Sequence, residues 1–298
     1  MFRIIGKSEG FILFALMREM RINQWTKNVL VYAALLFGGG LFHEGQFILA
    51  TQMFSSFCLV SSGVYFINDI FDVEKDRVNC RKKNRPIASG EISVITAWSS
   101  AIVLFSIGLV LSYIVSSSCF FILLSYIILN FLYTIWLKHM VILDVMIIAY
   151  GFVARAASGA MAIQESMTMW FMLCVMFLSL FLALGKRRHE LWALEQDHMK
   201  EARAVLQYYT IELIDQLMTI VTAGVLMCYA LFVMDNSTRD RQAMIITLPL
   251  VIYGVFYYLY IVRVKHSGGA PDEALYREKP ILTVVLLYVF IVIVARNF

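Results

Sequence analysis

The stretch ATQMFSSFCLVSSGVYFINDIFDVEKDR, residues 50–77, decides the fold of this chain. Residues 50–70 are almost all apolar or small, and about 20 such residues are enough to cross a bilayer as an α-helix. The apolar run then ends in three aspartates, Asp69, Asp72 and Asp76, within a few residues of one another. The stretch therefore predicts a membrane helix that terminates in a dense acidic motif.

The composition extends this interpretation to the whole chain. Of 298 residues, 60% are apolar and 15% are charged, and the mean hydropathy is +0.75. Soluble domains average about 45–50% apolar and about 25% charged residues. Long apolar runs with only four prolines favour helices over the alternating strands of a membrane barrel. We therefore expect an all-α polytopic membrane protein with a single domain over 1–298. Its nine expected spans are residues 28–46, 50–70, 95–115, 119–137, 141–163, 167–185, 213–234, 243–263 and 280–296.

Lysine and arginine predict the orientation of these spans, because short cytoplasmic loops carry an excess of both. Of 25 such residues, 21 fall on the N-terminal side, 3 on the opposite side, and Arg155 lies inside a span. We expect a bacterial inner or plasma membrane protein whose N-terminus and active site are cytoplasmic and whose C-terminus is outside. The expected cytoplasmic parts are an interfacial segment, 1–27, and loops 71–94, 186–212 and 264–279. The bases sit in short clusters between spans, which argues against binding to nucleic acid.

The acidic motif at the end of the second span predicts a metal site. If residues 68–76 form one continuous helix, Asn68, Asp69, Asp72 and Asp76 fall within an arc of about 100°. Carboxylates crowded on one face repel one another unless a cation lies between them, and oxygen ligands of this kind suit Mg²⁺ together with substrate phosphates. The alternative is a solvated helix end balanced by nearby lysines and arginines.

A basic run follows the acidic motif. Residues 81–90 read Arg-Lys-Lys-Asn-Arg-Pro-Ile-Ala-Ser-Gly, and cationic side chains beside a metal site are what a phosphate ligand requires. The candidate phosphate-binding residues here are Arg77, Lys82, Lys83 and Arg85. The run would also anchor the adjoining spans on the cytoplasmic side, and the two roles are compatible.

The Asn-Asp-x-x-Asp-x-x-x-Asp-Arg pattern of residues 68–77, followed by Asn-Arg-Pro-Ile-Ala-Ser-Gly at 84–90, resembles the first aspartate-rich motif of the UbiA superfamily of membrane prenyltransferases. The resemblance implies a bundle of about nine transmembrane helices around a central cavity that is open to the cytoplasmic side. It also implies that Asp72 and Asp76, assisted by Asn68 and Asp69, hold Mg²⁺ and a diphosphate there.

The chain departs from typical prenyl-diphosphate users after the sixth expected span. Where those proteins carry a second aspartate-rich motif, residues 184–191 read Leu-Gly-Lys-Arg-Arg-His-Glu-Leu, with one acid. The Lys-Arg-x-x-Glu-Leu pattern resembles the decaprenyl-phosphate phosphoribosyltransferase branch, as do residues 21–28, 133–138, 151–159 and 268–272. This branch implies phosphoribosyl diphosphate as donor and a polyprenyl phosphate as acceptor. Lys186 and Arg187 would then bind the 5-phosphate, and Glu190, on the same helix face as Lys186, is a further candidate for substrate binding.

Four further polar residues are candidates for substrate binding: Lys27, Tyr133, Lys138 and Arg155. The lysines equally suit anchoring at span ends, and Arg155, costly inside a membrane, equally suits a structural pair. Two other functions compete with phosphoribosyl transfer. One is transfer of a prenyl group from a prenyl diphosphate to an aromatic or other acceptor, and the other is non-enzymatic transport of a lipid or anion. A homo-oligomer is compatible with the sequence.

Overall fold

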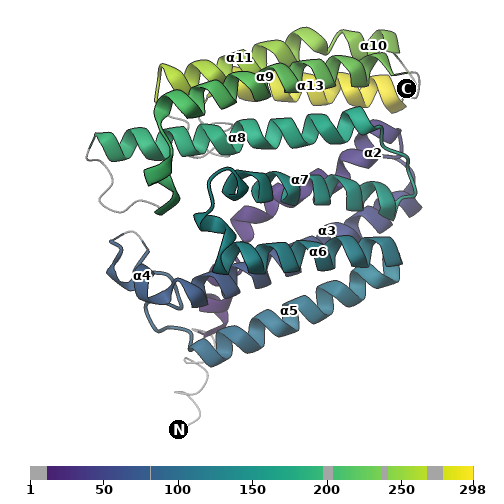
Figure 1. Cartoon of the computed structure of the whole chain (residues 1–298). Coiled ribbons are helices and arrows are strands. Elements are labelled where there is room, and N and C mark those ends of the chain that lie inside the picture. The colour runs from purple at the N-terminus through teal and green to yellow at the C-terminus, as the bar shows by residue number, and fades with distance from the viewer. Residues whose placement is uncertain (1–11, 81, 197–203, 236–240, 267–277, 298) are drawn as a thin grey trace.

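The computed structural model describes the chain except residues 1–11, 81, 197–203, 236–240, 267–277 and 298. Within the described part every regular element is a helix, and the long helices run side by side in one bundle (Figure 1). The elements are η1 (Ile22–Tyr32), α2 (Ala33–Gly38), α3 (Glu44–Phe71), α4 (Val73–Val78), α5 (Val94–Val115), α6 (Ser117–Ile135), η2 (Leu137–His139), α7 (Leu143–Ala162), α8 (Met169–Glu195), η3 (Ala204–Tyr208), α9 (Ile211–Met234), α10 (Arg241–Ile245), α11 (Leu248–Arg263) and α13 (Lys279–Asn297).

Eight segments in the described residues are long and apolar enough to cross a membrane. They correspond to the second through ninth expected spans, and the eighth of the nine is divided into α10 and α11, just before Pro249. Large apolar side chains such as Ile107, Val110 and Phe290 stay exposed on the outside of the bundle, where lipid would cover them. The prediction of an all-α, multi-pass membrane protein is confirmed.

The first expected span, residues 28–46, is not the continuous α-helix that we predicted. It begins within the 3₁₀-helix η1 and continues into the short helix α2. Contacts along α3 show its course: Arg21 pairs with Asp69, Trp25 Nε1 donates to Ser62 at 3.1 Å, and Tyr32 donates to Thr51 at 3.1 Å. Residues 21–32 therefore run antiparallel to α3.

The backbones of η1 and α7 pack closely against each other. A Cβ atom built on Gly159 of α7 would lie 1.9 Å from the carbonyl oxygen of Val31, so only glycine lets η1 approach α7 so closely. The polar and aromatic composition of η1, with Asn23, Trp25, Thr26 and Asn28, gives it little intrinsic preference for a regular α-helix.

Side-chain caps begin several of the long helices. Ser93, Ser116, Thr168 and Thr210 each accept a hydrogen bond from the backbone N–H three residues on, at the starts of α5, α6, α8 and α9. Such caps satisfy an amide that the helix leaves unpaired. The sequence thus marks where these spans begin, in agreement with their expected positions.

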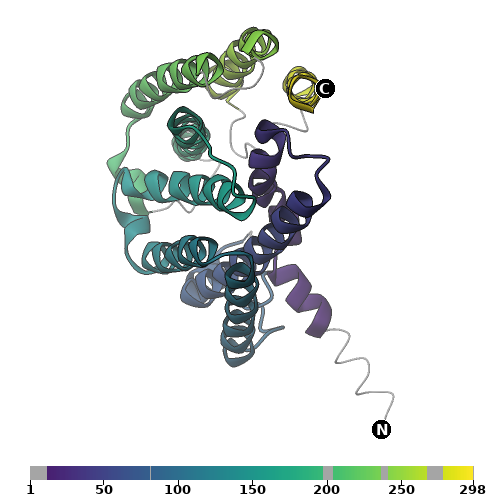
Figure 2. The same ribbon diagram turned by 90° about the vertical axis from the view of Figure 1, so that its right-hand side faces the viewer.

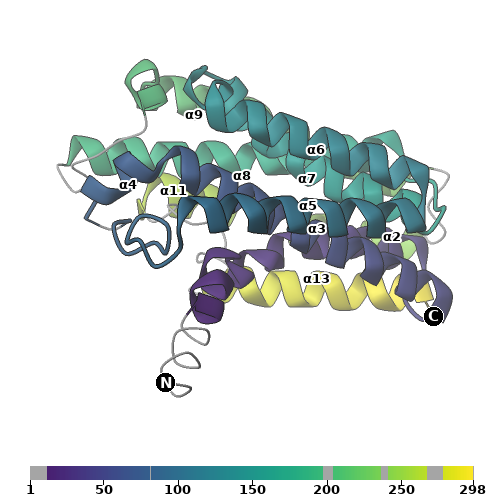
Figure 3. The same ribbon diagram turned by 90° about the horizontal axis from the view of Figure 1, so that it is seen from below.

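The ring of helices closes between its first and last members. In Figure 2, which views the bundle from its right-hand end in Figure 1, α13 stands next to α2, and the two are in contact. Figure 3 shows the long helices roughly parallel, with α4 and the loop after it at one end of the bundle, here called the α4 end. The C-terminus lies at the opposite end (Figure 1). The expected central cavity and its opening to the cytoplasm stay predictions.

Candidate active site

The acidic motif is split where α3 ends. Asp72 follows Phe71 with φ −96° and ψ 5°, which is not helical, and α4 starts again at Val73. Our assumption of one continuous helix over 68–76 is therefore wrong at Asp72, although α-helical hydrogen bonds from the Asp72 N–H to the Asn68 carbonyl (3.0 Å) and from the Asp76 N–H to the Asp72 carbonyl (2.8 Å) span the interruption. The side chains of the four motif residues divide into two groups. Among the described residues no group of three or more His, Cys, Asp or Glu side chains is arranged to hold a metal ion.

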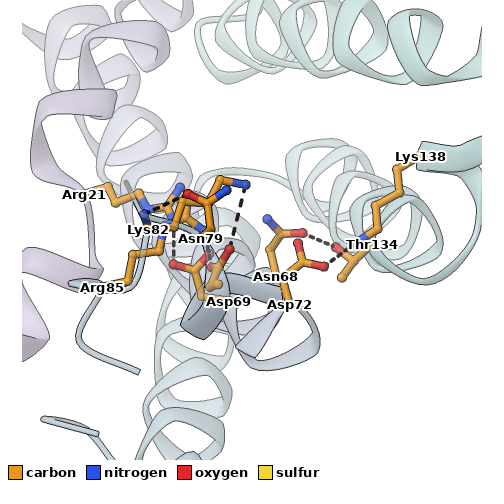
Figure 4. A network of polar contacts seen from close by, with 10 residues as sticks. Arg21, Asn68, Asp69, Asp72, Asn79, Lys82, Arg85, Thr134 and Lys138 are labelled. Carbon is orange, nitrogen blue, oxygen red and sulfur yellow. Dashed lines mark hydrogen bonds and ion pairs between the residues drawn. The ribbon is translucent and has the colours of Figure 1, made fainter. Parts of the chain in front are cut away.

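One half of the motif gathers around Arg85. Asp69 and Asp76 are buried, with relative exposures of 1% and 2%, and Arg85 Nη1 donates to both at 3.0 and 2.6 Å. Arg21 pairs with Asp69, and Lys82 Nζ lies 3.8 Å from Asp76. Figure 4 shows these basic side chains converging on the carboxylates from one side. A single arginine nitrogen thus lies between the two carboxylates.

The other half of the motif turns toward α6 and η2. Lys138 Nζ donates to Asp72 at 2.8 Å, and Thr134 donates to the side-chain oxygen of Asn68 at 3.4 Å. In Figure 4 Asn68 and Asp72 point away from Arg85 and toward Thr134 and Lys138. Lys138, which the sequence left divided between anchor and substrate-binding residue, is therefore a direct neighbour of the acidic motif.

Glu19 is a buried acid that sequence reasoning missed. It is 1% exposed at the end of the helical residues 12–19, and its Oε1 has no partner among the described residues. Burial, followed by the nearby charge of Asp69, raises the pKa of Glu19 to about 8, and its carboxyl hydrogen-bonds Asp69. The only signal in the sequence was its place between Arg18 and Arg21. Burial also raises the pKa of Asp76, against the opposing charge of Arg85.

A second polar centre lies on α8, facing α7. Arg187 is 1% exposed, its Nε donates to Asp144 at 2.7 Å and its Nη1 to Glu190 at 2.9 Å. Tyr209 donates to the other oxygen of Asp144 at 2.8 Å. Arg187 Nη2 is buried and has no partner among the residues described, so one donor of the guanidinium is unsatisfied. Tyr209 was not among the expected site residues.

Lys186, Arg187 and Glu190 lie on the α8 helix, where we expected a loop that begins at residue 186. The α8 helix continues to Glu195 because residues 186–195 contain good helix formers and neither glycine nor proline. Lys186 is half-buried on the same turn as Arg187. The extension carries this basic sequence beyond the apolar part of the span, so that it stays rigid and faces the neighbouring helices.

The C-terminal end of α6 lies between the two centres. Thr134 and, in η2, Lys138 contact the acidic motif. Tyr133, one residue before Thr134, is close enough to Arg187 to interact electrostatically with it. The C-terminal end of α6 therefore contacts the acidic motif and lies near the α8 centre, although more than a hundred residues separate those two in the chain.

Other expected site residues lie apart from this arrangement. Arg155 is buried in the middle of the bundle, where its nitrogens donate to Asn28 at 2.7 Å, to the Gly151 carbonyl at 2.6 Å and to Tyr126 at 3.1 Å. Those contacts join η1, α6 and α7 to one another. Arg77 pairs with Glu74 on an exposed surface. Lys83 is exposed at the α4 end, and Lys27 is half-buried on η1. The expected resemblance at 268–272 lies outside the described residues.

The acidic half around Arg85 fits a divalent cation. Both carboxylates reach one positively charged atom, and the two distances exceed the ~2.1 Å of a Mg–oxygen bond by less than 1 Å. Asp69 and Asp76 could hold an ion at the place of that nitrogen after a small closure. The structure thus pairs Asp76 with Asp69, whereas the sequence favoured Asp76 with Asp72.

Comparisons with known proteins agree on one family. The model of the UbiA prenyltransferase family matches residues 28–276. Decaprenyl-phosphate phosphoribosyltransferase of Corynebacterium glutamicum is 33% identical over 94% of this chain and 86% of its own length. The protein of the same name from Mycolicibacterium smegmatis is 31% identical over 93% of this chain and 91% of its own length.

A solved structure shares the fold. A UbiA homologue from Archaeoglobus fulgidus, bound to GPP and Mg²⁺, superposes with a TM-score of 0.74 at 18% identity, over 95% of this chain and 100% of that one. At that identity the likeness concerns the arrangement of the helices alone. It matches the all-helical bundle described above.

Proposed function

This chain belongs to the UbiA prenyltransferase family, and from that premise we propose that it transfers a 5-phosphoribosyl group from phosphoribosyl diphosphate to a polyprenyl phosphate, releasing diphosphate. The two relatives compared above carry the name of this activity and align with nearly the whole chain. The cytoplasmic location of the α4 end is part of the proposal and rests on the distribution of lysine and arginine.

The observation that carries the proposal is the pairing of an acidic centre with a separate basic one. Phosphoribosyl diphosphate has a diphosphate at one end and a 5-phosphate at the other. The carboxylates of α3 and α4 suit a metal-bound diphosphate, and Lys186 with the remaining donor of Arg187 suits a phosphate held directly. A prenyl diphosphate carries no phosphate group apart from its diphosphate, so it would leave the α8 centre without a ligand.

The side chains of the acidic centre would prepare the departing group. A bound Mg²⁺ would offset the charge that develops on the diphosphate as it leaves. Asp69 and Asp76 would hold that ion, and Asp72 and Asn68 would turn from Lys138 and Thr134 to complete its ligands. Arg21, Lys82, Arg85 and Lys138 surround the carboxylates and would bind diphosphate oxygens.

The α8 centre would orient the sugar. Arg187 is held rigidly by Asp144 and Glu190, so its free nitrogen would have a fixed direction. With both ends of the donor held, the bond from ribose carbon one to the diphosphate breaks as an oxygen of the lipid phosphate attacks from the opposite face. Catalysis would then come mainly from positioning and charge, since the lipid phosphate needs no base to be nucleophilic.

A transfer assay tests the proposal. Purified protein is incubated with Mg²⁺, phosphoribosyl diphosphate labelled in the ribose, and decaprenyl phosphate, and the lipid extract is counted. We expect a labelled lipid that requires all three components. A parallel reaction with labelled geranylgeranyl diphosphate and an aromatic acceptor represents the rival activity. Product in the second reaction alone would replace phosphoribosyl transfer by prenyl transfer.

A further inference from the structure

Each aspartate of the acidic motif is paired with at least one basic side chain. These bases come from three separate parts of the chain: the residue before η1, the loop after α4, and η2 (Figure 4). The pairs are Asp69 with Arg21 and Arg85, Asp76 with Arg85 at 2.6 Å and Lys82 at 3.8 Å, and Asp72 with Lys138 at 2.8 Å. The carboxylates proposed to bind a metal are thus already held by positive charges.

A metal ion and these bases compete for the same oxygens. Mg²⁺ requires carboxylate oxygens at ~2.1 Å and in near-octahedral geometry. An ammonium 2.8 Å from the same carboxylate repels the ion and occupies part of its coordination space. A diphosphate supplies new acceptors for the same bases, and charge-assisted bonds to phosphate are of the same strength class as those to carboxylate.

We propose that metal and diphosphate bind by an exchange of partners, in which Mg²⁺ takes the carboxylates and the basic side chains pass from the aspartates to the diphosphate oxygens. Lys138 is the clearest case, because its ammonium has Asp72 as a close partner and its side chain is 15% exposed. The inference rests on the proposed metal–diphosphate site, but it is independent of the group that the diphosphate carries.

The exchange of partners predicts that Mg²⁺ and diphosphate each strengthen the binding of the other. Mg²⁺ binding alone must break the Lys138–Asp72 pair, and diphosphate binding alone must break it too. When both bind, the pair is broken once, so each ligand tightens the other by the strength of that pair. If Lys138 only added a fixed positive charge, it would change both affinities and leave their coupling untouched.

The experiment measures three affinities by isothermal titration of the purified full chain and of Lys138→Met. They are the affinities for Mg²⁺ alone, for inorganic diphosphate alone in EDTA, and for inorganic diphosphate with saturating Mg²⁺. We expect Lys138→Met to bind Mg²⁺ alone roughly fivefold more tightly, the upper range for a partly screened ion pair. The coupling between Mg²⁺ and diphosphate should fall by the same factor. Formation of Mg–diphosphate in solution is identical for both proteins and cancels.

Lys265→Met is the matched control. Lys265, two residues after the end of α11, pairs with Glu278 at the same 2.8 Å, so the substitution removes the same charge and an equivalent pair away from the aspartates. We expect it to change neither the Mg²⁺ affinity nor the coupling. Lys82→Met is a second test, because Lys82 is about half exposed and its loss should leave folding intact. It should act in the same direction as Lys138→Met, with a smaller factor.

Two results would overturn the exchange. One is an unchanged coupling in Lys138→Met despite a tighter Mg²⁺ site, and the other is a Mg²⁺ affinity that does not rise. Both measurements use only Mg²⁺ and inorganic diphosphate. A protein that shows the expected coupling yet makes no labelled lipid from phosphoribosyl diphosphate would therefore retain the exchange and lose the proposed function.

Discussion

Replacing Asp144 with asparagine tests the role of the buried pair at the α8 centre. Asp144 is fully buried, and its oxygens accept from Arg187 Nε at 2.7 Å and from Tyr209 at 2.8 Å. Asparagine keeps the shape of the side chain and removes its charge. Arg187, itself 1% exposed, would then lack its buried counter-charge from α7 and would retain only Glu190 on its own helix.

The expected loss follows from that burial. Removing one partner of a buried ion pair typically costs about 3–5 kcal/mol, because the remaining charge stays desolvated. Glu190 is partly exposed and compensates part of this, which places Asp144→Asn near the lower value, about 3 kcal/mol. The free energy of unfolding would be measured by equilibrium denaturation in mixed detergent micelles. Binding of phosphoribosyl diphosphate should weaken in parallel, because Arg187 loses its fixed direction.

Asp215→Asn provides the matched control. Asp215 also pairs with an arginine of α8, Arg188 at 2.8 Å, but its side chain is 28% exposed to solvent. Arg188 is 8% exposed but keeps the Val262 carbonyl as an acceptor at 2.9 Å. The loss should therefore be smaller than that of Asp144→Asn, about 1–2 kcal/mol. A double variant that removes both charges, Asp144→Asn with Arg187→Met, should recover most of the stability without recovering donor binding. Equal small losses for Asp144→Asn and Asp215→Asn would refute the claim that the α7–α8 pair is a desolvated structural element.

Asp72→Asn and Asp76→Asn should each lower the transfer rate by about a hundredfold or more, because several kcal/mol of charge stabilisation would be lost and about 1.4 kcal/mol corresponds to a tenfold change in rate. EDTA should abolish the transfer. A near-normal rate in either variant would remove that residue from the metal ligands. Lys186→Ala should weaken binding of phosphoribosyl diphosphate by about 1.5–3 kcal/mol and leave binding of inorganic diphosphate almost unchanged. Equal losses for the two ligands would contradict a 5-phosphate site on α8. Exposed Cys80, at the α4 end, should react with an impermeant thiol reagent only after cells are opened, whereas Ser118→Cys at the opposite end should react in intact cells. Labelling of Cys80 in intact cells would reverse the orientation.

Local sequence predicted the main structural elements well. Eight spans appear close to their expected positions, and serine or threonine caps mark where several begin. These features depend on runs of about 20 neighbouring residues and on hydrogen bonds three residues apart. The acidic motif and the basic Lys186–Glu190 stretch were also visible, because each is contiguous in the chain.

The conformation of the first expected span could not be predicted from local sequence. Residues 28–46 were expected to form one α-helical span, but η1 adopts 3₁₀ geometry against α3 and α7, and Asn28 is bonded to Arg155, 127 positions away in the sequence. No acidic residue lies close to Arg155 in the sequence, so the sequence did not indicate its partners. Its neighbours are an amide, a tyrosine and a backbone carbonyl from three elements.

The sequence by itself determined the membrane class, the order of the helices and the residue types available for chemistry. Only the tertiary structure decided how those residues are grouped. It broke the helix at Asp72, placed Arg85 between Asp69 and Asp76, turned Asp72 toward Lys138 and buried Arg187 against Asp144. The physical reason is that a buried charge must find a partner, and in a packed bundle that partner comes from whichever helix lies alongside, often more than forty residues away.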